Sequence, residues 1–362
     1  MRTPNATLYD VVSTLRAEHL LGDEALAYLD GRPVQQPWYI RAMVGFGAWL
    51  ASLLLIGFVA SFGLVMDGGY AFIGLLLIAA AILLRHRSEN DFLVQCALAT
   101  SLAGQALAAY GYAKMIGLEE FEVFLGVVLV VSSALFFLFP DRIHRVLMVL
   151  LAAGSVTTLC YVREMNALVP LLGPAFTAAL ILLQRKVPDL VATRLSIFVR
   201  PLMNGFMLSA FGVLLISTAY VLPELGLERQ LYPRPWISTI LLGGLFLYVG
   251  TLIWPTVVSP GNSKAMPYLY GMMVIVIMFA WAAPGLVLGL IVVMLGAASG
   301  RTTFIGAGIG FFAIFLASYF YGIEVSMLTK SVVLVATGVV ILISRWVILR
   351  LAATEQGGSS HA

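Results

Sequence analysis

The sequence predicts an all-α protein: a polytopic bundle of about twelve transmembrane helices, with both termini in the cytoplasm and a small cytoplasmic helical headpiece. Three observations support this fold class. The 362 residues are 61% hydrophobic and only 11% charged, whereas a soluble domain carries about 25% charged residues. The apolar residues fall into runs of about 15–22 residues, close to the length that crosses a bilayer. The basic residues gather on alternate connections between these runs.

Residues 1–40 are polar and mixed in charge, and they predict a cytoplasmic headpiece of two short helices. Gly22 ends the first periodic segment, Asp23 is a good N-cap for the second, and Gly31 closes it. We expect the headpiece to pack on the inner face of the bundle, with the membrane surface or a partner as alternatives. The first apolar run begins only near Ala42, too late for a signal peptide, so we expect it to remain as a membrane helix.

The rest of the chain divides into a transmembrane bundle, residues 41–350, and a disordered cytoplasmic tail, residues 351–362. Only Ala283 to Gly285 separate the ninth and tenth apolar runs of the bundle, so one kinked element is the alternative there. Charged or Pro/Gly breaks separate twelve runs in all, near residues 42–64, 69–84, 92–113, 123–139, 146–162, 167–184, 202–222, 236–254, 268–282, 285–299, 304–321 and 331–349.

The distribution of charge favours twelve helices over eleven. With the N-terminus inside, all but five of the 21 Lys and Arg residues lie on inner segments, as the positive-inside rule requires. Merging the ninth and tenth runs would move Arg301, Arg345 and Arg350 to the outside. We therefore expect both termini in the cytoplasm.

Motifs of soluble enzymes are missing from the sequence. The four histidines (His19, His86, His144 and His361) are scattered and none has a second ligand at metal-binding spacing, so no metal site is expected. No catalytic residue and no cofactor is assigned, and a non-enzymatic role is favoured. The net charge of +3 is too small to indicate nucleic acid as a partner.

The middle of each predicted helix lacks ionisable residues, although ion-coupled transporters usually bury a few. The remaining polar groups are uncharged and are expected mainly to form hydrogen bonds between helices. Gln95 and Gln105, with Tyr110 and Tyr112 further along the same run, form the most polar stripe.

Three glycine pairs spaced four residues apart predict close helix packing within the chain, with a partner-binding face as the alternative. They are Gly285–Gly289, Gly296–Gly300 and Gly306–Gly310.

Two predicted outer connections carry charge. Glu119, Glu120 and Glu122 form an acidic cluster beside the fourth run, either a solvated turn or a docking point for a basic segment or a cation. In the last connection, Lys330 lies at the unfavourable end of a helix dipole and on the unfavoured side of the membrane.

The residues around Lys330 form a candidate outer-face functional or partner cluster, with a solvent-exposed ion pair to Glu324 as the simpler interpretation. The cluster comprises Tyr319, Tyr321, Glu324, Lys330 and Ser331.

The segment "YFYGIEVSMLTKSVVLVATGVVILISRW", residues 319–346, resembles the C-terminal signature of an uncharacterised bacterial polytopic membrane family, domain of unknown function 4401. The resemblance covers residues of about 40–350 and implies no assigned activity. It also implies a partner, because genes of this family often neighbour one for a single-pass, membrane-anchored protein with a GDYxxLxY motif.

The sequence leaves three functional hypotheses. The first is a non-enzymatic, multi-pass component of an envelope complex in the bacterial inner membrane, whose partners are the lipid bilayer and the single-pass protein. The second is a transporter or channel for an uncharged or lipid-like solute. The third is a membrane enzyme that acts on a lipid-linked substrate.

Overall fold

The computed structural model describes residues 69–88, 90–116, 121–191, 193, 195–217, 232, 234–257, 266–281 and 283–322, together with isolated positions within 43–57 and 328–335. The headpiece, the first and twelfth apolar runs and the C-terminal tail lie wholly or mostly outside these residues. Helices make up the regular structure of the described part, which contains no strand.

The described helices follow the second to eleventh apolar runs of the sequence. They are α4 (Gly69–Arg87), α5 (Asp91–Met115), α6 (Phe121–Leu138), α7 (Arg142–Val162), α8 (Val169–Val191), α9 (Ser196–Ile216), α10 (Pro235–Val257), α11 (Met266–Phe279), α12 (Pro284–Ser299) and α13 (Thr302–Gly322), with a short 3-10 turn, Asn166–Leu168, before α8.

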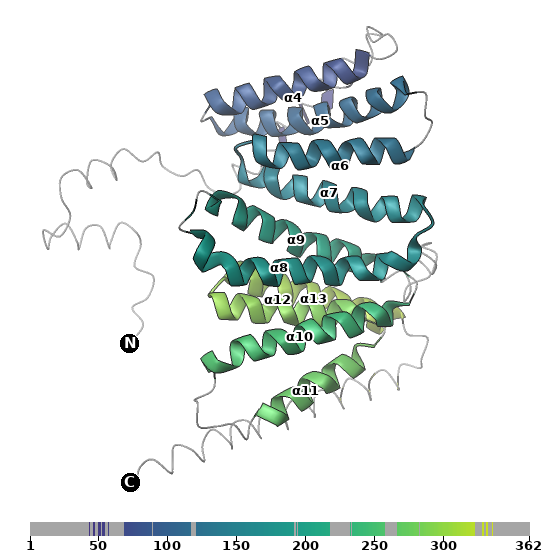
Figure 1. Ribbon diagram of the computed structural model, residues 1–362, viewed down its shortest axis with the longest axis vertical. Coiled ribbons are helices and arrows are strands. Elements are labelled where there is room, and N and C mark those ends of the chain that lie inside the picture. The colour runs from purple at the N-terminus through teal and green to yellow at the C-terminus, as the bar shows by residue number, and fades with distance from the viewer. Residues whose placement is uncertain are drawn as a thin grey trace, which may run out of the picture.

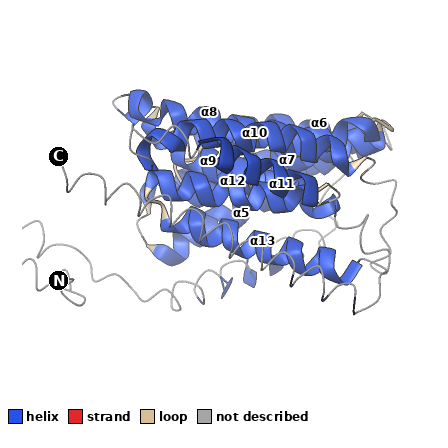
Figure 2. Ribbon diagram, turned by 90° about the horizontal axis from the view of Figure 1, so that it is seen from below, coloured by secondary structure: helices blue, strands red, loops and turns tan. Residues whose placement is uncertain are grey.

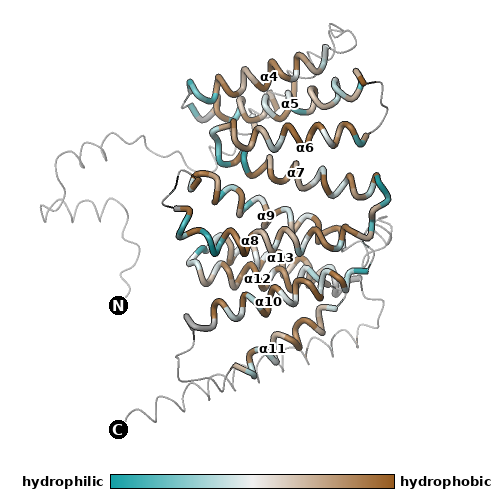
Figure 3. The backbone as a smooth tube through the Cα atoms, in the orientation of Figure 1, coloured by the Kyte–Doolittle hydropathy of each residue, from teal (hydrophilic) through white to brown (hydrophobic). Residues whose placement is uncertain are grey.

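Seven of the described helices, α4 to α10, are long and apolar enough to cross a membrane, and α11, α12 and the described part of α13 are shorter apolar helices. Figure 3 shows hydrophilic residues gathered toward helix ends, with apolar residues along the lengths between them. Large apolar side chains also face outward, such as Phe72 and Leu76 on α4. An all-helical, multi-pass protein with lipid as its main solvent accounts for this surface.

The ninth and tenth apolar runs form two separate helices. The first of them, α11, ends at Phe279, and α12 begins at Pro284. Proline suits the first turn of a helix, whereas inside a continuous helix its missing N–H would remove a backbone hydrogen bond. The two helices also have different main neighbours: α11 packs on α10, whereas α12 packs on α13, α10 and α9. The single kinked element is therefore excluded.

The helices lie side by side in a stack that runs from α4 at one end to α11 at the other (Figure 1), and Figure 2 shows the same bundle along the perpendicular direction. Helices that are adjacent in the chain form the closest pairs, namely α4–α5, α6–α7, α8–α9 and α12–α13. The α7–α9 contact joins the halves of the stack. One large apolar core lies among α7 to α13, and a smaller one lies among α4 to α7 and α9.

Glycines allow two of these pairs to approach closely. A Cβ added at Gly111 of α5 would lie 2.1 Å from the amide nitrogen of Ala71 in α4, and one at Gly74 would lie 2.4 Å from that of Ala108. Between α12 and α13, a Cβ at Gly308 would lie 2.9 Å from the carbonyl oxygen of Gly289. Each substitution would force the two backbones apart.

The three predicted glycine pairs have different roles. Gly285 and Gly289 face α13, which confirms packing within the chain for that pair. Gly296 also faces α13, but Gly300 ends α12 in the left-handed conformation, with φ 65°. Gly306 and Gly310 meet open space in the described part of the chain, because Gly308 occupies the contact face of α13.

Candidate functional site

Four polar side chains meet inside the bundle where α5, α6 and α7 pack together. Ser101 and Gln105 come from α5, Ser132 from α6 and His144 from α7, and each residue is at most 2% exposed. Burying a polar group costs free energy unless it forms hydrogen bonds. These residues, here named the buried polar cluster, are therefore the strongest candidate for a functional site in the described part of the chain.

Hydrogen bonds between helices connect the cluster. Ser101 Oγ and His144 Nε2 lie 2.9 Å apart. Gln105 Nε2 donates to Ser132 Oγ at 2.7 Å and also lies 3.7 Å from the sulfur of Met148. The cluster therefore links all three helices through side chains that carry no fixed charge.

Two polar atoms of the cluster have no partner within the described residues: His144 Nδ1 and Gln105 Oε1. Most buried polar atoms in folded proteins are paired with protein or with water. The amide oxygen can only accept a hydrogen bond, whereas Nδ1 donates or accepts according to the tautomer that the bond to Ser101 selects. The cluster thus offers unused hydrogen-bonding capacity inside an apolar bundle.

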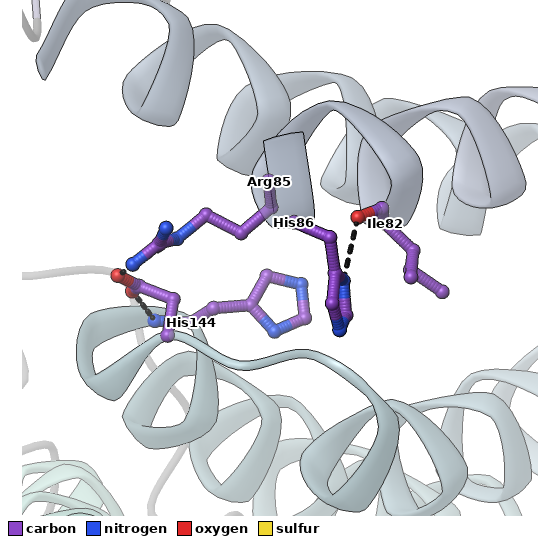
Figure 4. A network of polar contacts seen from close by, with 5 residues as sticks. Ile82, Arg85, His86 and His144 are labelled. Carbon is purple, nitrogen blue, oxygen red and sulfur yellow. Dashed lines mark hydrogen bonds and ion pairs between the residues drawn. The ribbon is translucent and has the colours of Figure 1, made fainter. Parts of the chain in front are cut away.

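The turn between α6 and α7 holds His144 in place. The carboxylate of Asp141 caps α7 by accepting the backbone N–H of His144 at 2.9 Å. The imidazole stacks on Phe139, with ring centroids 3.9 Å apart and an interplanar angle of 18°. Asp141 also pairs with Arg85 of α4 at 3.9 Å, so this ion pair lies beside the histidine. Figure 4 shows Arg85, His86 and His144 in this region between α4 and α7.

Arg145, the next residue of α7, completes the end of α6. Its Nε donates to the carbonyl oxygen of Phe136 at 3.1 Å. The usual helical donor for that oxygen would be the amide of residue 140, but Pro140 has none. The guanidinium lies 4.5 Å from the centroid of Phe198 on α9. A cation at the C-terminal end of a helix is also favourable for the helix dipole, so the main role of Arg145 is structural.

The buried polar cluster extends along the helices. His144 is in the first turn of α7, at the α6–α7 turn, whereas Gln105 lies about 21 Å along α5 from its first residue, at 1.5 Å per residue. The polar groups therefore reach from one end of the bundle to the middle of α5.

The residues of the polar stripe predicted in the third run differ in burial. Gln105 is buried and belongs to the cluster, whereas Gln95 is half-buried. Tyr110 and Tyr112 are about half exposed and face away from it. The sequence does not point to His144, because this residue lies in the charged turn before the apolar run at residues 146–162.

The acidic cluster at the start of α6 is partly described, with Glu122 in the first turn of the helix. Glu122 pairs at 2.5 Å with Arg163, which follows the last residue of α7. A basic residue of the same chain therefore already binds this carboxylate. Glu119 and Glu120 lie outside the described residues.

The candidate outer-face cluster around Lys330 stays a prediction. The backbones of Tyr319 and Tyr321 belong to the last turn of α13, and Ser331 is an exposed helical residue. Glu324 and Lys330 lie outside the described residues.

A second buried polar group lies at the start of α10. The hydroxyl of Tyr232 lies 2.7 Å from Ser238 Oγ, and Ser238 in turn donates to the carbonyl oxygen of Pro170 at 2.6 Å. Because Ser238 uses its only proton in that bond, Tyr232 is the donor in the first one. Tyr232 is fully buried and connects α10 to α8, which is a structural role.

Metal chemistry has no candidate in the described residues, where no three His, Cys, Asp or Glu side chains gather at ligand distance. Cys160 is buried and Cys96 is half-buried, and both are free.

The comparisons with known proteins identify a family but no activity. No curated protein and no solved structure matches the chain. A family model described as "Domain of unknown function" matches residues 37–351, which is most of the chain. The chain therefore belongs to the DUF4401 family, as its C-terminal signature indicates.

Proposed function

We propose that the protein is a transporter or channel of the bacterial inner membrane for a small, uncharged solute that forms hydrogen bonds. In this proposal the bundle of residues 41–350 crosses the membrane twelve times, with the headpiece and the tail in the cytoplasm. The solute passes along α5, α6 and α7 through the buried polar cluster.

The observation that carries the proposal is the pair of unpartnered buried atoms, His144 Nδ1 and Gln105 Oε1. An ionisable residue inside a membrane bundle is costly and generally functional. A solute that carries both an N–H or O–H donor and an acceptor would use this unused capacity. Polyols and urea-like amides have that chemistry.

The composition of the cluster favours an uncharged solute over an ion. Its hydrogen-bonding groups are two hydroxyls, one amide and one imidazole. The nearby carboxylate of Asp141 is already engaged by Arg85 and by the amide of His144. A charged solute would therefore lack a counter-charge in the cluster.

The test uses purified protein in vesicles that are shrunk by an excess of external glycerol or urea. The rate of re-swelling, followed by light scattering, reports entry of the solute. Wild-type protein is expected to speed re-swelling relative to empty vesicles. His144→Phe and Gln105→Leu should each return the rate to that of empty vesicles, because they remove the two hydrogen-bonding atoms.

The matched control is Ser133→Ala, whose hydroxyl is exposed and bonds only to its own helix, at Leu129. This variant should keep the wild-type rate. The proposal is overturned if wild-type vesicles behave like empty ones with both solutes, or if the two cluster variants remain as fast as the control.

The topology has a separate test. A reporter fused after residue 362 should be active only in the cytoplasm, because both termini are placed there. Reporter activity in the periplasm would rule out the twelve-helix arrangement.

A role in an envelope complex is the second candidate function. Among the described residues, the exposed side of α13 carries small residues: Gly306 and Gly310 meet no neighbour there, and Ala313 and Ala317 are also exposed. Such a face would let the helix of a single-pass partner approach α13 closely.

The test is co-purification in mild detergent. A stoichiometric partner should co-purify with the wild-type protein and with Ile314→Leu, and it should be lost in Gly306→Leu and in Lys330→Met. A partner that is retained in the last two variants would refute this interface.

A further inference from the structure

Two arginines converge where the start of α9 meets the turn between α12 and α13. Arg200 is exposed in the first turns of α9, and Arg301 is the half-buried residue between α12 and α13. The left-handed Gly300 ends α12 and turns the chain at this point. The two basic side chains thus come from segments that are distant in sequence.

The packing of Arg301 places its guanidinium beside α9. Its Nη1 lies 3.7 Å from the sulfur of Met203, and its Cζ lies 5.3 Å from the ring centroid of Phe304. Met203 follows Arg200 by three residues, so both lie on the same face of α9. Met203 and Phe304 are fully buried, which limits the movement of the Arg301 side chain.

The described residues contain no acid that neutralises this pair. The ion pairs among the described residues are those of Arg85 with Asp141 and of Arg163 with Glu122, and neither involves Arg200 or Arg301. Burial and the charge of Arg200 both lower the pKa of Arg301. Guanidinium groups carry a fixed positive charge, so these two repel one another and attract an anion.

The surroundings identify the anion as part of a lipid. In the proposed topology these arginines lie at the cytoplasmic interface, where anionic phospholipids supply phosphate groups. Exposed apolar side chains lie deeper on both helices, Leu208 on α9 and Ile309 on α13. A free phosphate has no use for such a surface, whereas the acyl chains of a phospholipid would cover it.

We propose that Arg200 and Arg301 bind the phosphate of an anionic phospholipid in the cytoplasmic leaflet. The two guanidiniums supply the charge and the hydrogen-bond donors that a phosphate accepts. The N-terminal end of α13, which follows Arg301 directly, adds a positive electrostatic potential. The lipid would fasten α9 to the α12–α13 pair at the membrane surface.

The experiment titrates phosphatidylglycerol into the full-length protein in a neutral detergent and follows the thermal unfolding midpoint. The midpoint of the wild-type protein is expected to rise and saturate. Each of Arg200→Gln and Arg301→Gln should weaken the apparent affinity about fivefold, the factor that corresponds to about 1 kcal/mol per basic residue at such a surface. Arg87→Gln, at the exposed end of α4, is the matched control and should titrate as the wild type does.

Two further titrations separate the sources of the anion. Phosphatidylcholine and inorganic phosphate are each expected to leave the midpoint unchanged. If inorganic phosphate gives the same shift as phosphatidylglycerol, the site takes a free anion and the lipid assignment is wrong. If the glutamine variants titrate like the wild type, the arginines do not bind the headgroup. Should Arg301→Gln fold poorly, the exposed Arg200→Gln decides the question alone.

Discussion

Ser101 Oγ and His144 Nε2 lie 2.9 Å apart and join α5 to α7 across 43 residues of sequence, with both residues fully buried. This hydrogen bond is the most direct polar link between the two helices. It also fixes which hydrogen-bonding role remains for the other ring nitrogen of His144. Stability and function therefore depend on the same contact.

Ser101→Ala is expected to lower the free energy of unfolding by about 1 kcal/mol, the usual scale for hydrogen bonds between membrane helices. The loss arises because His144 Nε2 is left unpaired inside the bundle. Unfolding in mixed detergent–SDS micelles measures it. Ser133→Ala, which removes an exposed hydroxyl from α6, should change the stability by much less; equal losses in the two variants would contradict a stabilising role for the buried bond.

Gly111→Ala and Gly126→Ala are expected to have opposite effects. The new Cβ at residue 111 would lie 2.1 Å from a backbone nitrogen of α4, so α4 and α5 must separate, at a cost of about 3 kcal/mol. At Gly126 no described residue would contact the new Cβ, and alanine is the better helix former by about 1 kcal/mol. Unfolding curves of both variants under the same conditions test this. A stabilised Gly111→Ala would show that the α4–α5 contact is not close.

Glu122→Gln is expected to cost less than 1 kcal/mol, about the upper limit for exposed ion pairs. Its partner Arg163 is 62% exposed in its side chain, so solvent and salt screen the attraction. The reversed pair, Glu122→Arg with Arg163→Glu, should recover most of the loss. Unfolding at low and high salt measures both effects, and a large loss that does not depend on salt would point to a further role for Glu122.

Tyr232 is expected to make the protein sensitive to alkaline pH. Burial, with a smaller contribution from the nearby Tyr161, raises the pKa of Tyr232 above its ordinary value. The folded state then holds this proton more tightly than the unfolded state, so its stabilising effect is complete below about pH 10 and declines above it. Stability measured from pH 8 to pH 11 should fall less in Tyr232→Phe than in the wild type. Identical slopes would mean that another group is responsible.

The positions of the helices follow from hydropathy, but the buried polar cluster does not. Pro235–Val257 agrees with the apolar run at residues 236–254, because apolar runs of this length have one stable form in lipid. By contrast, α7 begins at Arg142, four residues before the predicted run. Polar residues in a first turn lower the local hydropathy without preventing the helix, and Asp141 as an N-cap was the signal for the true start.

Contacts between helices were the least predictable feature. A spacing of four residues shows that Gly306 and Gly310 share a face of α13, but not that Gly308 is the glycine that packs on α12. In a membrane protein the outward faces are also apolar, so hydropathy does not separate inside from outside. For the same reason, Ser101 and His144 are recognisable as partners only once α5 and α7 are placed side by side.

The close pairing of helices that adjoin in the chain bears on how the protein reaches the membrane. Because α4–α5, α6–α7, α8–α9 and α12–α13 are the most extensively packed pairs, each of them can assemble as soon as its second helix leaves the ribosome. Insertion can therefore advance two helices at a time, with polar turns left at the surface. The joins between pairs, such as the α7–α9 contact, and the packing of α10 on α12 must wait for later parts of the chain.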